Sequence, residues 1–122
     1  MLQIVFNKIS AAEISRIPTL EQLDLLGEFQ VSESMLQTLD DARFGKMEKD
    51  GKTLYRYVAK DYRIYFEVID GKVGVHRVLH ANSLNDFLFR TNISPTAGED
   101  EILSQSKHFW KLIDEGKNSS KA

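Results

Sequence analysis

The spacing of apolar residues changes from helical to alternating between the first and second thirds of the chain. A short β-branched run at residues 2–6 predicts a strand. Residues Ser10 to Glu13 then match the Ser/Thr-x-x-Glu/Gln pattern that opens a helix, and Pro18 is expected to end that helix near Ile17. The first part of the chain therefore predicts a strand followed directly by a short helix.

A second helix is predicted from Thr19, because Thr19 to Gln22 repeat the capping pattern. The apolar residues expected on one face of this helix are Leu20, Leu23, Leu26 and Phe29. Ser32 is expected to cap one or two further turns, whose inward-facing residues would be Met35, Leu36 and Leu39. Residues 10–41 thus predict a helical hairpin with an acidic outer surface.

After a polar segment at residues 40–52, which we expect to be a loop, apolar and polar residues alternate instead of following the helical period. The predicted strands are residues 54–59, 62–69 and 73–80. Tight turns at Lys60-Asp61 and Asp70-Gly71 join them. The three strands should therefore form an antiparallel meander.

The C-terminal third returns to helical spacing. A third capping pattern, Ser83 to Asp86, predicts a helix with Arg90 near its end, and Pro95 and Gly98 mark a linker. From Glu99 the apolar residues expected on one helical face are Ile102, Leu103, Phe109, Trp110 and Ile113. Gly116 is placed as a stop, followed by a frayed polar tail.

This order predicts an α+β fold in which the first strand joins the later three in one sheet, with helices covering one face. We expect one domain over residues 1–95, with the helix and tail of residues 96–122 packed on it. A chain of 122 residues is long enough to bury a core without disulfides or metal. Because cysteine is absent, cysteine-ligated zinc and thiol nucleophiles are excluded.

Composition bounds the remaining classes of function. The N-terminus lacks a cationic start followed by a long apolar run, so we expect a cytoplasmic protein and no membrane association. The three histidines show no His-x-x-x-His spacing and no carboxylate cluster joins them, so neither a metal nor another cofactor is expected.

Charge is distributed unevenly along the chain. The formal net charge is −2, but residues 1–42 carry two Lys/Arg and seven Asp/Glu, whereas residues 43–90 carry ten and six. The first segment is therefore −5 and the second +4. This segregation predicts an acidic face on the helical hairpin and a basic face on the strands.

The basic strands resemble a known family. The segment "LYRYVAKDYRIYFEVIDGKVGVHRVLH", with Arg56 before a short turn and Asp61-Tyr62-Arg63 heading an apolar strand, is similar to the RelE/ParE superfamily of bacterial toxins from toxin–antitoxin systems. The resemblance covers residues 2–90 and implies the RelE-like fold. It also implies neutralisation by a partner antitoxin.

Two activities are implied by the two branches of this family. RelE-like members cut mRNA on the ribosome, by attack of a ribose 2′-OH on the adjacent phosphate, whereas ParE-like members inhibit DNA gyrase and cut nothing. For RNA cleavage, cations must hold the developing charge and other groups must transfer protons. Arginine suits the first role because its planar fork matches phosphate oxygens.

The resemblance assigns roles to particular residues. Arg63 and Arg56 would hold the phosphate. His76 or His80 could stand in as the proton-transfer group, because imidazole titrates near neutral pH, and His80, at the end of a strand, is the better candidate. The side chains expected to bind substrate are Lys60, Tyr65, Arg77 and Arg90. Alternation places His76 with His80 on one strand face and Arg77 on the other, so the two sets cannot line one cleft.

Structural roles and a second function stay open. Arg63 could instead pair with Glu67 or Asp61, and we favour structural roles for Arg77 and His76. The family usually has a basic cluster after the last strand and then a tyrosine, but the corresponding segment here is "HANSLNDFLFR". A ParE-like or catalytically reduced protein that binds gyrase or an antitoxin is therefore the alternative, and a plain scaffold is the third hypothesis. A homodimer or a complex with the antitoxin fits either of the first two.

Overall fold

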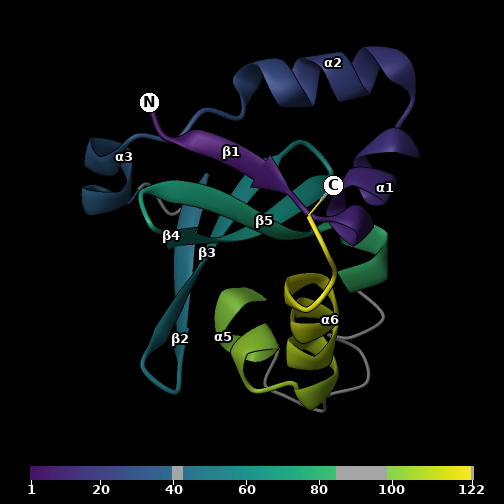
Figure 1. Cartoon of the computed structure of the whole chain (residues 1–122). Coiled ribbons are helices and arrows are strands. Elements are labelled where there is room, and N and C mark those ends of the chain that lie inside the picture. Colours follow the sequence, from purple (N-terminus) through teal and green to yellow (C-terminus); the bar gives the residue numbers. More distant parts are fainter. Residues whose placement is uncertain (40–42, 85–98, 122) are drawn as a thin grey trace.

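The computed structural model describes residues 1–39, 43–84 and 99–121 (Figure 1). The helices are α1 (Lys8–Ser15), α2 (Thr19–Glu28), α3 (Glu33–Gln37), α5 (Glu99–Ser104) and α6 (Lys107–Lys117). The strands are β1 (Gln3–Phe6), β2 (Phe44–Lys49), β3 (Lys52–Ala59), β4 (Tyr62–Ile69) and β5 (Lys72–His80). The α+β class predicted from the sequence is therefore confirmed. None of the helices within these ranges is long and apolar enough to cross a lipid bilayer.

The sheet has five strands in the order β1-β5-β4-β3-β2. The three predicted strands do pair as an antiparallel meander, β3-β4-β5, but the expected sheet of four strands was wrong, because a fifth strand extends it. The strand that the sequence analysis missed is β2, which lies in the segment expected to be a loop and pairs antiparallel with β3. It contributes buried Phe44 and Met47 to opposite faces of the sheet. At the far edge, β1 pairs with β5 in parallel.

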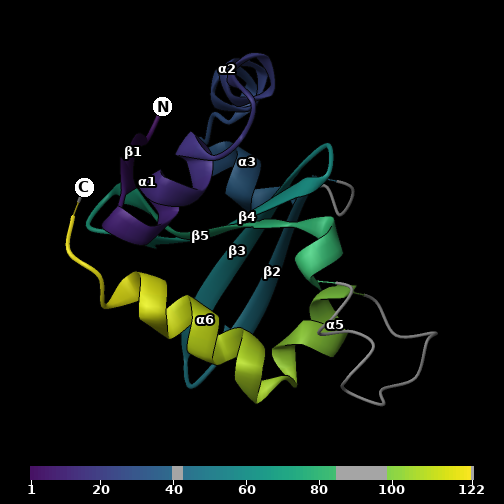
Figure 2. The same ribbon diagram turned by 90° about the vertical axis from the view of Figure 1, so that its right-hand side faces the viewer.

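Helices cover both faces of the sheet, not one as predicted (Figures 1 and 2). On one side α1, α2 and α3 enclose a core that includes Phe29, Ile64 and Phe66. On the other side α5 and α6 cover a second core, in which Tyr65 packs with Phe109. Two separate apolar cores therefore stabilise the sheet from its two sides.

Tight turns join the meander strands. Asp70 and Gly71 both have positive φ, 53° and 74°, and Lys60 has φ 53° at the predicted Lys60-Asp61 turn, so both predicted turns are confirmed. A third turn of this kind, at Asp50-Gly51, joins β2 to β3. At Asp50-Gly51 and Asp70-Gly71 both central residues have positive φ, which matches the right-handed twist of a hairpin.

Three helix starts differ from the predicted ones. Pro18, not Thr19, is the N-cap of α2, and no side chain caps this helix. Asn7, not Ser10, caps α1: its side-chain oxygen accepts from Ser10 N at 2.7 Å, and Ser10 Oγ accepts from Asn7 N at 3.0 Å. Glu13 is consequently freed from any capping role. Residues 81–84 are helical, so the helix predicted to open at Ser83 begins earlier. The predicted cap at Ser32 is confirmed, since its hydroxyl accepts from Met35 N at 3.3 Å.

The predicted C-terminal helix is divided in two. Ser106 begins α6 by accepting from Phe109 N, and Gly116 lies inside α6 instead of ending it. A Cβ at Gly116 would overlap the carbonyl of His76, so this glycine allows α6 to approach β5 closely. The tail is also attached, because Lys8 N donates to Ser120 O at 2.9 Å.

Candidate functional site

The three arginines of the basic strands that fall within the described residues lie on one face of the sheet. Arg56 on β3 is paired with Tyr65 on β4, which is paired with Arg77 on β5. Arg63 is two residues before Tyr65, and side chains two apart in a strand share a face. The register therefore brings Arg56, Arg63 and Arg77 onto the face that α5 and α6 cover.

Arg56 is held by a carboxylate from α5. Its Nε donates to both carboxylate oxygens of Asp100, at 3.0 and 3.1 Å, and its Nη2 donates to Oδ2 at 3.0 Å. Nη1 donates to the carbonyl of Arg43 at 3.2 Å, and the side chain is 8% exposed. Gly45 leaves room for the pair, because a Cβ there would overlap the guanidinium. The fork expected to hold phosphate is occupied by the protein's own carboxylate.

Arg77 is held in the same way from α1. Its Nε and Nη2 donate to the carboxylate of Glu13 at 2.8 to 3.1 Å, and Nη1 donates to the carbonyl of Leu112 at 3.0 Å. Glu13 also accepts from Val78 N at 2.9 Å. These contacts tie α1, β5 and α6 together. They agree with the structural role that we favoured for Arg77.

Tyr65 is fully buried between the sheet and α6. Its ring meets that of Phe109 at a centroid distance of 5.0 Å in an edge-to-face arrangement. Stacking on a base, the role expected of Tyr65, requires an open ring face. In this conformation α6 takes the place that such a base would need.

Arg63 lies on the same face of the sheet, two residues before Tyr65 in β4, and is half-buried. Its Nη1 donates to the carbonyls of Lys60 and Tyr62 at 3.2 and 3.3 Å. Glu67, one of the carboxylates expected to pair with Arg63, instead contacts His76 and Lys117.

His80 lies on the opposite face of the sheet from Arg63. Its ring packs edge-to-face on Tyr62 at 5.0 Å, and its Nδ1 accepts from Asn82 N at 3.0 Å. The structure therefore does not bring the predicted proton-transfer group to the arginines. Arg90 lies outside the described residues, as do the residues that replace the family's tyrosine.

A bulge in β5 changes the position of His76. Tyr65 and Phe66 are adjacent in β4, but their partners are Arg77 and Val75, so His76 is the extra residue. Its side chain consequently lies on the α6 face beside Arg77, and not with His80 as alternation predicted. His76 Nε2 lies 3.1 Å from Glu67 Oε1, which also accepts from Lys117 at 3.2 Å. Burial lowers the pKa of His76, although the hydrogen bond and charge of Glu67 oppose that shift.

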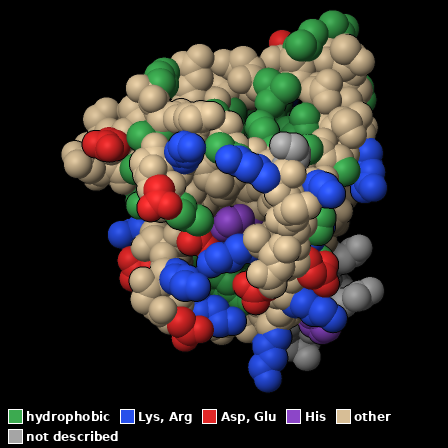
Figure 3. All heavy atoms as spheres, in the orientation of Figure 1, with side chains coloured by type: hydrophobic (Ala, Val, Ile, Leu, Met, Phe, Trp, Pro, Cys, Tyr) green, Lys and Arg blue, Asp and Glu red, His purple; other side chains and the backbone are tan. Residues whose placement is uncertain are grey.

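A hollow of about 260 Å³ opens beside this network, between the β2–β3 turn and α6. Its basic residues are Lys49, Lys52 and Lys117, and Lys49 Nζ lies 5.0 Å from the centre of the Trp110 ring. Figure 3 shows Lys and Arg side chains gathered on this side of the molecule, around a histidine. The carboxylates of Asp50, Glu67 and Asp114 line the same hollow, so its formal charge is balanced.

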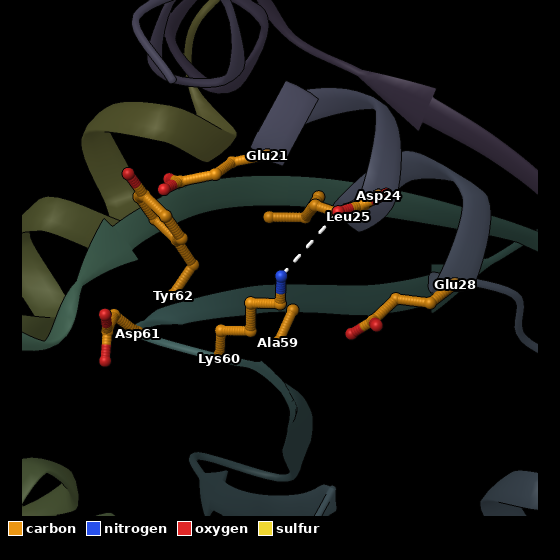
Figure 4. Close-up of a pocket in the computed structure, with 8 residues that line it drawn as sticks. All are labelled: Glu21, Asp24, Leu25, Glu28, Ala59, Lys60, Asp61 and Tyr62. Atoms are coloured by element: carbon orange, nitrogen blue, oxygen red, sulfur yellow. Dashed lines mark ion pairs between the residues drawn. The ribbon is translucent and has the colours of Figure 1, made fainter. Parts of the chain in front are cut away.

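A second, more acidic pocket lies between α2 and the β3–β4 turn (Figure 4). Four carboxylates line it, together with one cation and the phenol of Tyr62; the charged residues are Glu21, Asp24, Glu28, Asp61 and Lys60. Lys60 Nζ points up from the turn and lies 3.6 Å from the carboxylate of Asp24. The pKa of Tyr62 is raised by burial and then by the charges of Glu21 and Asp61, as expected for a pocket of negative potential.

The outer side of α2, next to this pocket, is apolar. Leu20, Leu23 and Leu26 are 78%, 61% and 40% exposed, whereas Leu25 and Phe29 are buried against the sheet. The three exposed leucines share one side of α2, as their spacing predicted, but Phe29, which was predicted to lie with them, is on the buried side. The spacing alone did not indicate that the leucine side of α2 would be uncovered.

Comparison with known proteins finds no match, because no family model, curated protein sequence or solved structure is significantly similar to this chain. Within the described ranges, no three His, Asp or Glu side chains are grouped so that they could bind a metal ion. The proposals below therefore depend on the geometry and on the sequence resemblance.

Proposed function

We propose that this chain is a RelE/ParE-like protein that acts by binding another protein and not by cleaving RNA. The observation that carries the proposal is that the guanidinium of Arg56, the group predicted to bind phosphate, is already bound to a carboxylate of the protein. Arg56 is 8% exposed and bound to Asp100 through three hydrogen bonds. A buried charge that is already paired gains little by exchanging its partner for an anion from water.

Other contacts on the same face support this conclusion. Arg77 is engaged by Glu13 and by the carbonyl of Leu112, and Tyr65 lies beneath α6. Binding of an RNA strand would require α5 and α6 to leave, which would expose the apolar core around Phe109 and Trp110. That face is therefore better suited to stabilise the fold than to hold a substrate.

The order of elements supports the family. Strand β1, three helices, the strands of the meander and C-terminal helices follow each other as the resemblance implies, apart from the additional strand β2. The expected partner is a cognate antitoxin, encoded next to this chain, and the target of a free ParE-like protein would be another protein such as gyrase.

Induction of the chain in bacteria tests the proposal. We expect mRNA ends, mapped across the transcriptome, to be the same with and without the protein. We also expect the product of the adjacent reading frame to co-purify with it in a defined ratio. Codon-phased mRNA cuts that disappear in Arg63→Ala, but persist in the surface control Lys46→Ala, would overturn the proposal.

A second candidate is the ribosome-dependent mRNA endonuclease. The observation that favours it is the alignment of Arg56, Arg63 and Arg77 on one face of the sheet. For this candidate we expect Arg63→Ala to abolish toxicity while circular dichroism shows an unchanged fold. Full toxicity of a folded Arg63→Ala variant would remove Arg63 from the mechanism.

A further inference from the structure

Helix α2 presents an apolar stripe to solvent. Leu20, Leu23 and Leu26 follow each other at intervals of three residues, so they lie along one side of the helix. Leu25, which points the other way, holds α2 on the core. Figure 3 shows hydrophobic side chains at the molecular surface in this region, and Figure 2 shows α2 standing apart from the other helices. Exposed apolar groups gathered in this way are typical of interaction surfaces.

An acidic row runs beside the stripe. Glu21, Asp24 and Glu28 recur at intervals of three and four residues, so they line the side of α2 that borders the pocket of Figure 4. The pocket holds about 40 Å³, which is room for a small polar group. Lys60 is the one cation among the residues that line it; its side chain is 67% exposed, and its ammonium lies 3.6 Å from the carboxylate of Asp24. The pocket therefore carries an excess of negative charge, which a second cation would reduce.

We propose that the α2 surface, meaning the leucine stripe together with this acidic pocket, binds an amphipathic helix of a partner protein. The apolar side of the partner helix covers Leu20 and Leu23, and a Lys or Arg beside that apolar side enters the pocket. The inference rests on the proposed protein-binding function and gives that function a site and a partner chemistry.

Charge complementarity selects this occupant. A second copy of the chain, related by a twofold axis through α2, would bring its own Glu21, Asp24 and Glu28 toward the same acidic row, and this contact is repulsive. A helix with an apolar seam and basic flanks complements the whole α2 surface, because its seam covers the leucine stripe and its basic residues face the acidic pocket. A partner helix with acidic flanks would leave the pocket unbalanced and would be rejected.

Two synthetic peptides test the proposal on the full chain. The first is a fluorescein-labelled helix with a leucine seam and lysine flanks, and the second has glutamate in place of each lysine. We expect the basic peptide to bind, by fluorescence anisotropy, at least tenfold more tightly than the acidic one. Leu23→Glu should weaken its binding at least tenfold, and Glu21→Gln should weaken it less. Ile69→Glu, at a similarly exposed apolar residue on the end of β4, should leave it unchanged.

Three outcomes would overturn the proposal: equal binding of both peptides, equal binding to the wild type and Leu23→Glu, or a wild-type dimer that Leu23→Glu converts to a monomer. A complex with the adjacent gene product that survives Leu23→Glu would overturn the α2 surface while leaving the proposed function intact. Codon-phased mRNA cleavage would overturn the proposed function but not the peptide result. The two failures are thus distinguishable.

Discussion

Replacement of Asp100 by alanine should destabilise the fold, because it removes the carboxylate from an almost fully buried guanidinium. Three hydrogen bonds of 3.0 to 3.1 Å join Arg56 to Asp100. In Asp100→Ala the carbonyl of Arg43 would still accept from Nη1, but the two donors that face α5 would lose the acceptor they share. The remaining charge would stay in a site from which water is largely excluded.

Breaking a buried pair by removing one partner costs about 3 to 5 kcal/mol. The side chain of Asp100 is 25% exposed, so water can partly replace its carboxylate, and we expect a loss of about 2 to 3 kcal/mol in the free energy of unfolding. The double variant Arg56→Met/Asp100→Leu removes both charges together. It should lose less than Asp100→Ala, because neither charge of the pair is left behind in the core.

Urea denaturation followed by fluorescence measures this difference, since Trp110 is the single tryptophan and lies on α6. Asp24→Ala is the matched control: its pair with Lys60 is 68% and 67% exposed, and exposed pairs contribute about 0 to 1 kcal/mol. A loss below about 0.5 kcal/mol in Asp100→Ala would refute the reasoning. It would mean that Arg56 does not depend on α5 and can bind an anion from solution.

Three further predictions concern the packing of α6, the charge of His76 and the buried carboxylate of α1. Gly116→Ala should lower the free energy of unfolding by about 1 to 3 kcal/mol, because the new Cβ would overlap the backbone of β5. Gly27→Ala, where the space around the Cβ is open, should raise it by about 0.5 to 1 kcal/mol. The midpoints of urea denaturation compare the two variants. Because the pKa of His76 is lowered in the folded chain, the unfolded chain takes up a proton at His76 near pH 6.5 and the folded chain only at lower pH. The free energy of unfolding should therefore fall as the pH drops below 6.5, and it should fall less steeply in His76→Gln. Glu13→Gln should cost about 2 to 4 kcal/mol in the same assay, because Arg77 then keeps only the half-exposed carboxylate of Glu115, at 3.8 Å, as a counter-charge. A variant as stable as the wild type would contradict the structural role of the Glu13–Arg77 pair.

The strands of the meander could be predicted because their sequence carries local signals. Alternating apolar residues and an Asp-Gly turn specify the β4–β5 hairpin without reference to the rest of the chain. Strand β2 lacks such a signal: its buried residues Phe44 and Met47 are three apart and lie on opposite faces. Only the position of β2 beside β3 makes it a strand.

The candidate site could be predicted only in part, for a related reason. Sequence identified the arginines, but the carboxylates that engage Arg56 and Arg77 lie 44 and 64 residues away along the chain. No local spacing relates Arg56 to Asp100 or Arg77 to Glu13. Likewise, the bulge that turns His76 toward α6 follows from the packing of β5 and not from the alternation of its residues.

The pairing of β1 with β5, and of Asn7 with Lys121, has a consequence for synthesis of the chain. These contacts join the beginning of the sequence to residues that leave the ribosome late. The first strand therefore has no partner while the helical hairpin is being made, and contacts of such long sequence separation form slowly. We expect the hairpin of β3 and β4 to form early and β1 to dock last, so that the sheet is completed only after β5 has been translated.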